Sequence, residues 1–297
     1  MTSHGTPIGS EWCEALYAES KLVEFVKLAK SGVHKVPSCI PIDDIIKRVS
    51  SLDDLRDVCR SDIGWILQKE SKGIRTFYRH DSSNRHIHSI RLDGEVDAPL
   101  FILLAMLHEV DLFHKWIPTY AFLGLEFATQ IAHPSPTELL VHLSVNVPWP
   151  FRNRYCFFHC DGIDCMDDTE EAQIGVIISN RTNEAEFNIS PTGVKTHFHP
   201  PSGILLTPLD DGRTRVQIVV NLDPQIALIP EWLIDIAVRS LAYLIILQFR
   251  KAVEIVKSDP EYHKRMTSQD SDFYNHIKRR IRESLPNEVQ YIPVSEE

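Results

Sequence analysis

The sequence predicts an α+β protein in which a curved antiparallel sheet wraps around one long helix. Two observations carry this prediction. Short runs of β-branched and aromatic residues, separated by turn residues, extend from about residue 62 to residue 222. One long apolar segment follows them, at residues 229–258. Because strands and helix form consecutive blocks and do not alternate, the arrangement belongs to the α+β class.

Two helices are expected before the sheet. Residues 10–30 and 43–58 both have the apolar spacing of an amphipathic helix, and Ser10 is placed to cap the first of them. In the second helix the apolar residues recur at steps of three and four positions, at Ile45, Ile46, Val49, Leu52 and Leu55. We therefore assign residues 1–60 to an N-terminal helical extension.

About nine strands are expected in the central part of the chain, with Gly or Asx in the tight turns at residues 72–73, 81–84 and 210–212. A helix at residues 99–116 separates the third strand from the fourth, with Asp97 as its cap and Pro99 at its first position. The predicted strands are residues 63–70, 74–80, 86–96, 124–129, 138–147, 154–164, 171–179, 195–207 and 213–222.

The last helix is expected at residues 229–258. In its first turn, Pro230 stands where a missing N–H is harmless, and Glu231 faces the positive end of the helix dipole. Its apolar residues extend around most of the circumference, whereas a helix lying on a sheet needs an apolar face only about 100° wide. The helix therefore either covers a second apolar object, such as a ligand, or is a fully buried core helix. Residues 259–297 are charged and weakly periodic, and we expect a tail there.

Composition limits the function. Lys and Arg total 31 and Asp and Glu total 41, so the net charge is −10, which argues against nucleic-acid binding. No segment has the pattern of a signal peptide, and Asp235 and Arg239 interrupt the most apolar window, so no membrane span is expected. The six cysteines lack CxxC spacing, which is typical of reduced thiols. We expect a soluble cytoplasmic protein.

Four stretches in order resemble one known family. They are DAP at residues 97–99 with FHKW at 113–116, then VPWPFRNR at 147–154, then GVK at 193–195 with SG at 202–203, and finally Asp223 with IPEWLID at 229–235. Together they resemble the START (steroidogenic acute regulatory-related lipid transfer) domains, over about residues 60–257. The resemblance implies a helix-grip fold at residues 61–258, with a tunnel that encloses one lipid, and a protein that is not an enzyme by virtue of this domain.

Strand alternation places Leu139, Val141 and Leu143 on one face of their strand. By alignment with the family, residues 156, 158 and 160 point to the same face. A solid core would give the same alternation as the wall of a tunnel. The expected lipid-binding residues are Phe113, Trp116, Leu143, Arg154, Cys156, Phe158, His197, His199, Leu233, Ala237, Leu241 and Leu244. Within this set, packing is an alternative role for Trp116. Arg154 either pairs with an acidic group, for which Glu126 and Asp161 are conceivable partners, or is exposed.

The resemblance also bears on how the headgroup of phosphatidylcholine would be held. Relatives that bind phosphatidylcholine surround the choline with aromatic rings and contact the phosphate with an arginine. Two of the aromatic positions align with Leu143 and Cys156, and the arginine position aligns with Phe113. Neither Leu nor Cys offers a ring face to a cation, so a choline cage of that kind is not expected.

Histidine pairs raise two further possibilities. His197 and His199 lie one strand period apart, and by the family alignment they face the cavity and bond a lipid head; exposed histidines on a surface strand are the alternative. His86 and His88 suggest zinc, but random placement of 14 histidines already predicts roughly 0.7 such pairs. No metal or cofactor is therefore predicted. A phosphate-binding loop, a nucleophile elbow and an HExxH motif are all absent from the sequence.

We expect a lipid-binding protein that holds one phospholipid, sterol or sphingolipid in a hydrophobic cavity and carries it from one membrane to another. It would contact membrane surfaces transiently, bind no nucleic acid and act as a monomer. Residues 180–193 are a candidate gate, and the basic run at residues 276–282 either touches anionic lipid or is a solvated helix. Two other functions remain open. One is a lipid sensor whose residues 10–58 bind a protein partner, and the other is a histidine-based enzyme on the same fold.

Overall fold

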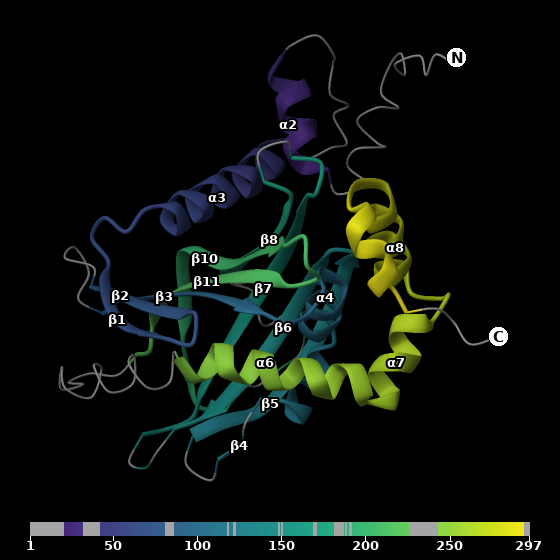
Figure 1. Cartoon of the computed structure of the whole chain (residues 1–297). Helices are drawn as coiled ribbons and strands as arrows, with labels where there is room; N and C mark the ends of the chain where they lie inside the picture. Colours follow the sequence, from purple (N-terminus) through teal and green to yellow (C-terminus); the bar gives the residue numbers. More distant parts are fainter. Residues whose placement is uncertain are drawn as a thin grey trace, which may run out of the picture.

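The computed structural model describes residues 21–31, 42–80, 86–117, 119–120, 123–147, 149, 151–168, 171–180, 187, 189, 192–225 and 243–293. Within these residues one sheet of eleven strands forms the centre of the molecule, in the order β1-β2-β3-β11-β10-β8-β7-β6-β5-β4, with β9 beside β7. All neighbours are antiparallel except β7 and β9. Figure 1 shows α3 along one face of this sheet and α6 across the other.

The strands agree with the expected ones to within a few residues, apart from β5, which is longer at its C-terminal end. Two short strands, β4 and β9, were not predicted. The strands are β1 (Ile66–Ser71), β2 (Ile74–His80), β3 (His88–Val96), β4 (Thr119–Tyr120), β5 (Leu123–Ser135), β6 (Glu138–Asn146), β7 (Arg154–Cys165), β8 (Gln173–Asn180), β9 (Val194–Lys195), β10 (His197–Pro208) and β11 (Thr214–Asp223). The helices are α2 (Leu22–Lys30), α3 (Ile42–Arg60), α4 (Leu100–His108), α6 (Tyr243–Ser258), α7 (Pro260–Thr267) and α8 (Asp272–Ser284), with 3₁₀ turns η1 (Val110–Lys115) and η4 (Pro286–Tyr291). The α+β prediction is therefore confirmed.

Both faces of the sheet are buried. On the inner face, Ile204 and Ile218 pair across β10 and β11 and pack with residues of α4, α6 and α8. On the outer face, Leu205 and Val219 pack with residues of α2 and α3. Alternate residues of one strand therefore enter two different cores.

The helix α3 is seated directly on the outer face. Leu52 and Leu55 are fully buried. A Cβ atom at Gly175 would overlap Leu52, and one at Gly203 would overlap Leu55 and the carbonyl oxygen of Val176. The two glycines thus let leucines of α3 approach the backbone of the sheet.

The C-terminal end of α3 is fixed by a buried arginine. Arg91 of β3 is 1% exposed and donates hydrogen bonds to the carbonyl oxygens of Val58 and Ser61, both at 2.7 Å. Its guanidinium lies 4.0 Å from the ring centre of Phe77 and 5.1 Å from that of Trp65. Carbonyl groups that the helix leaves unpaired at its end are thereby satisfied.

The expected helix at residues 99–116 is divided at Glu109 into α4 and η1. Glu109 departs from helical geometry, with φ −82° and ψ 70°. Its carboxylate accepts hydrogen bonds from Tyr274 at 2.7 Å and Arg265 at 2.5 Å. Tertiary bonds to the C-terminal helices therefore accompany the break in the helix.

The segment expected as a charged tail instead forms α7, α8 and η4. Asp259 caps α7 and Ser271 caps α8, each through its side-chain oxygen. The buried side of α8 follows helical spacing, with Phe273, Ile277 and Ile281 among its members. Of the expected last helix, the structure describes α6, and residues 226–242 lie outside the described part. Among the described helices, none is long and apolar enough to cross a bilayer.

Candidate lipid-binding site

A mainly apolar cavity of about 190 Å³ lies between the inner face of the sheet and α4, η1 and α8. The strands β6, β7, β8 and β10 form one wall, and the three helical elements form the other. The lining residues are Leu104, Leu107, His108, Val110, Phe113, Thr137, Leu139, Val141, Phe158, Cys160, Gly162, Asp164, Ile174, Val176, Ile178, Ile204, Phe273, His276 and Ile277.

The period of the strands explains the sheet side of the cavity. Leu139 and Val141 of β6 and Phe158 and Cys160 of β7 are alternate residues, so all four point to the inner face. The expected common face of these positions is confirmed.

A histidine in the wall is held uncharged by its surroundings. His108 of α4 stacks on Phe273 of α8, with ring centres 3.6 Å apart and an interplanar angle of 4°. The ring of His133 lies 5.4 Å away. Burial, and next the charge that His133 can carry, lower the pKa of His108 from 6.5 to about 3. At neutral pH this side chain adds no charge to the cavity.

This geometry predicts a contribution of His108 to acid sensitivity. The unfolded chain protonates at higher pH than the folded chain, so it binds more protons between about pH 6.5 and pH 3. Stability should therefore fall as the pH is lowered through this range, by up to about 1.4 kcal/mol per pH unit. We expect His108→Phe, which keeps a ring on Phe273, to flatten the dependence of urea unfolding on pH. The same change at exposed His263 should leave it as in the parent chain.

The thiols of the inner face are also neutral. Burial raises the pKa of Cys156 and of Cys160 to about 12. The carboxylate at the cavity edge, Asp164, is compensated by Arg280 of α8 at 2.6 Å. The cavity is thus suited to an apolar guest.

Four of the sequence-predicted residues meet at this site. Phe113 and Phe158 line the cavity. Leu143 and Cys156 are cross-strand partners that pack in the same cluster as those two residues. Strand alternation had placed Leu143 on this face, whereas Phe113, Cys156 and Phe158 came from the resemblance to the family.

Two other predicted residues have different surroundings. Trp116 is 6% exposed and packs between Phe113, with ring centres at 5.2 Å, and Phe249 of α6 at 5.6 Å, so it joins η1 to α6. Arg154 donates its Nε–H to the carbonyl oxygen of Pro224 at 2.8 Å, and other bonds go to carbonyl oxygens of Arg152 and Gln225. Among the described residues its hydrogen-bond partners are backbone carbonyls just before β7 and just after β11, and not the carboxylates of Glu126 or Asp161.

The expected orientation of His197 and His199 differs from the observed one. Phe198, between them, pairs with Leu222 and packs against Phe158 at 5.4 Å on the inner face. Alternation therefore directs the two histidines to the outer face. Leu233, Ala237 and Leu241 lie outside the described residues, and of Leu244 only the backbone in α6 is described.

On the helical side of the cavity, Phe113 of η1 was predicted from the sequence, but the contributions of α4 and α8 were not. Leu104, Leu107 and His108 come from α4, and Phe273, His276 and Ile277 come from α8. A signal existed in α8, because Phe273, Ile277 and Ile281 recur at four-residue steps. The basic residues between them interrupt this apolar pattern.

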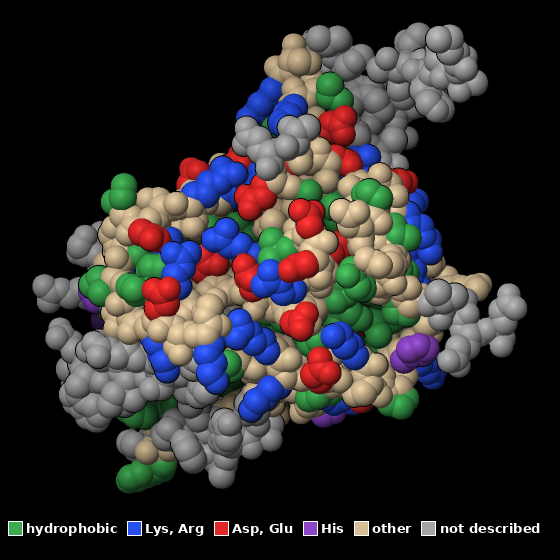
Figure 2. Space-filling view, in the orientation of Figure 1, with side chains coloured by type: hydrophobic (Ala, Val, Ile, Leu, Met, Phe, Trp, Pro, Cys, Tyr) green, Lys and Arg blue, Asp and Glu red, His purple; other side chains and the backbone are tan. Residues whose placement is uncertain are grey.

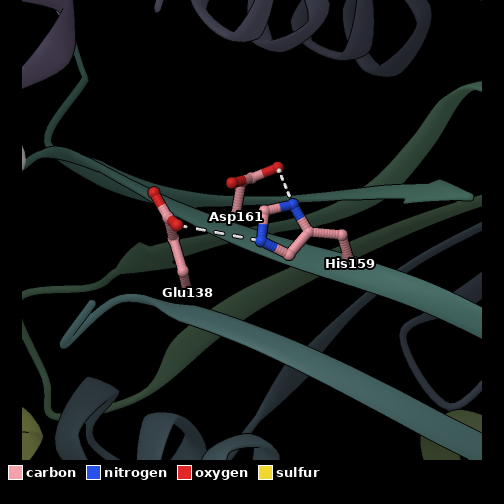
Figure 3. A group of neighbouring side chains, drawn as sticks. All are labelled: Glu138, His159 and Asp161. Carbon is pink, nitrogen blue, oxygen red and sulfur yellow. Dashed lines mark ion pairs between the residues drawn. The ribbon is translucent and has the colours of Figure 1, made fainter. Parts of the chain in front are cut away.

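Three potential metal ligands gather on the opposite face of the sheet (Figure 3). His159 stands between two carboxylates, with Nδ1 3.2 Å from Asp161 and Nε2 3.8 Å from Glu138. Arg48 of α3 also reaches both carboxylates, at 2.6 Å from Glu138 and 2.8 Å from Asp161. The guanidinium already supplies the positive charge that a metal would bring. We therefore interpret the group as an ion-pair network that joins α3 to the sheet.

The other histidine pair does not assemble a catalytic group with His197 and His199. Nδ1 of His88 lies 2.9 Å from the hydroxyl of Tyr78, and its cross-strand partner is His80, with ring centres 6.1 Å apart. His88 pairs with Leu222 on the inner face, whereas His197 and His199 lie on the outer one. The sheet separates the two pairs.

Proteins of known structure share this architecture. The chain is similar in structure to human STARD10, with a TM-score of 0.61 and 18% identity over 82% of this chain and 90% of that one. It is also similar to human StAR-related lipid transfer protein 5, with a TM-score of 0.57 and 16% identity over 70% and 95% of the two chains. Nothing among the curated proteins matches. The START domain family model matches residues 52–258. Because this match covers well over half of the sequence, the chain belongs to the START domain family.

Proposed function

We propose that this protein binds one lipid in the cavity between the sheet and α4, η1 and α8, and carries it between membranes. The observation that carries the proposal is the chemistry of the cavity wall, in which apolar side chains surround neutral His108 and Cys160. Each methylene group that such a wall removes from water contributes about 0.8 kcal/mol. The similarity to a lipid transfer protein supports the same function.

Loading a whole lipid requires the cavity to widen. Its volume of about 190 Å³ exceeds the roughly 150 Å³ of an engineered cavity that binds benzene, and is below the roughly 300–1,000 Å³ of most ligand pockets. The present cavity accommodates part of a lipid. Residues of α8 form part of the helical wall, so displacement of α8 would enlarge the cavity without separating the strands.

The wall favours guests recognised by shape and apolar contact. Phe113, Leu143 and Cys156 pack in one cluster. By the resemblance to the family they align with positions at which relatives hold a phosphocholine group, and they offer neither a cation cage nor a phosphate ligand. A sterol, a sphingolipid or a phospholipid held mainly through its chains fits this wall. We propose a non-catalytic carrier, since the described histidines of an alternative enzyme do not converge on one point. That the carrier is monomeric and cytoplasmic stays a prediction from the sequence.

The experiment that tests the function is native mass spectrometry of the purified chain, followed by extraction and identification of the bound lipid. A transfer assay between donor and acceptor liposomes then measures exchange of the lipid identified. A bound lipid with measurable exchange supports a carrier. A bound lipid without exchange favours a sensor, and a chain that binds none of the three lipid classes contradicts the proposal.

A cavity-filling substitution gives a sharper readout. Val176 of β8 lines the cavity and is half-buried. We expect Val176→Trp to remove most of the bound lipid, because the indole occupies the space of the guest, while the fold is retained. Val176→Ala, which enlarges the same space, should keep its lipid. Equal lipid content in the two variants would place the binding site elsewhere.

A further inference from the structure

The C-terminal helix α8 has two different sides. Phe273, His276 and Ile277 line the lipid cavity. The opposite side carries the residues at steps of three and four positions that are exposed or half-buried, namely Asn275, Lys278, Arg279 and Arg282. We call these four residues the basic stripe. It contains three cations and no acid.

Two of the cations have no carboxylate partner within the described part of the chain. Among the residues that the structure describes, no ion pair joins Lys278 or Arg282 to a carboxylate, whereas Arg279 lies 3.3 Å from Glu283. Burial, and next the charge of Arg282, lower the pKa of Lys278. Like charges four residues apart destabilise a helix. An anionic partner would relieve this repulsion.

The position of the stripe distinguishes it from the rest of the surface. The whole chain carries a net charge of −10, so its general field repels an anionic surface. Figure 2 shows basic side chains along the right-hand edge of the molecule, beside the place of α8 in Figure 1. α8 also lies beyond residue 258, where the match to the family model ends.

We propose that the basic stripe of α8 binds the anionic surface of a phospholipid bilayer and turns the cavity wall formed by α8 toward the membrane. This inference rests on the proposed lipid binding and adds the surface through which the protein docks. Continuity with the cavity favours a bilayer over an acidic protein, because the same helix presents the cations on one side and encloses the lipid site on the other. Docking through α8 therefore brings the cavity close to the donor or acceptor leaflet.

A rival docking surface exists at the other end of the sheet. Trp149 is 92% exposed and Phe151 is 39% exposed in the connection between β6 and β7. Exposed aromatic side chains are common at membrane interfaces. That connection meets β7 at Arg154, whereas α8 meets β7 near its last residues, at Asp164. The two surfaces cannot both be the primary contact of one docked orientation, so variants separate them.

The test is co-sedimentation of the full chain with two kinds of vesicle, phosphatidylcholine alone and phosphatidylcholine with about 30% phosphatidylserine. We expect binding to the anionic vesicles only, weakened by salt. Lys278→Gln with Arg282→Gln should reduce the partition coefficient about 30-fold, which corresponds to about 1 kcal/mol for each basic residue. The matched control is Lys27→Gln with Lys30→Gln, which removes two exposed charges from α2 and should leave binding unchanged.

The inference is overturned if the parent chain binds neither vesicle, if the Lys278/Arg282 variant binds as well as the parent, or if Trp149→Ser alone abolishes binding. Native mass spectrometry on the same samples separates this outcome from failure of the proposed function. A chain that retains its lipid while the α8 variant sediments like the parent contradicts only the docking surface. A chain without any lipid contradicts the proposed function itself. Thermal unfolding of the variant should match that of the parent, since neither replaced side chain has an acidic partner within the described residues.

Discussion

Arg280→Ala is expected to lower the free energy of unfolding by about 3–5 kcal/mol. Arg280 is 1% exposed, and its Nε donates to Asp164 at 2.6 Å. The side chain of Asp164 is 3% exposed, so loss of the guanidinium leaves a buried carboxylate without its cation. The other partners, Asp167 and Glu283, are about half exposed and return to water at little cost. Urea unfolding measures the loss, and hydrogen exchange should locate it in α8.

Two comparison variants make this prediction specific to the buried pair. Arg282→Ala removes an exposed arginine two residues away, and should change stability by no more than about 0.5 kcal/mol. Replacing both partners, with Arg280→Met and Asp164→Leu, should recover much of the loss, because an apolar pair of similar volume is often close to neutral. If the double variant is no more stable than Arg280→Ala, the charge pair is not the reason for the loss.

The buried arginine also explains why the sequence allowed a solvated helix at residues 276–282 but did not reveal that α8 packs into the core. Arg280 lies among the buried residues of the helix, between Ile277 and Ile281. A charged residue at a core position interrupts the apolar stripe that identifies a helix. Its partner Asp164 lies on β7, more than a hundred residues earlier. A pairing over that separation is a tertiary property, and no local pattern reports it.

The strands were predictable because alternation is local, but alternation does not say which face of a strand is the inner one. Here α3 covers the outer face, and α4 and α6 cover the inner face. Residues that point to either face of the central strands are therefore apolar. Leu139 and Val141 were placed together correctly by period alone. His197 and His199 were assigned to the cavity by family alignment, and the register with β11 places them on the outer face. Register depends on contacts between distant strands.

The second large effect on stability concerns the packing of α3 on the sheet. Leu52→Ala is expected to lower the free energy of unfolding by about 2–5 kcal/mol, because Leu52 is fully buried against Gly175 of β8. If α3 is part of the same cooperative unit as the sheet, urea unfolding monitored by tryptophan fluorescence and by circular dichroism should shift together to lower urea. Asp54→Ala, on the exposed side of α3, should have almost no effect.

A double-mutant cycle tests the contact itself. Gly175→Ala alone should destabilise the protein, because the new Cβ atom would overlap Cδ1 of Leu52. In the Leu52→Ala background that atom is absent, so the same substitution should cost much less and partly fill the space left by the leucine. The two changes should therefore be strongly non-additive. Additive effects, or separate unfolding transitions for helix and sheet, would show that residues 42–60 are an appendage to the family domain and not part of its core.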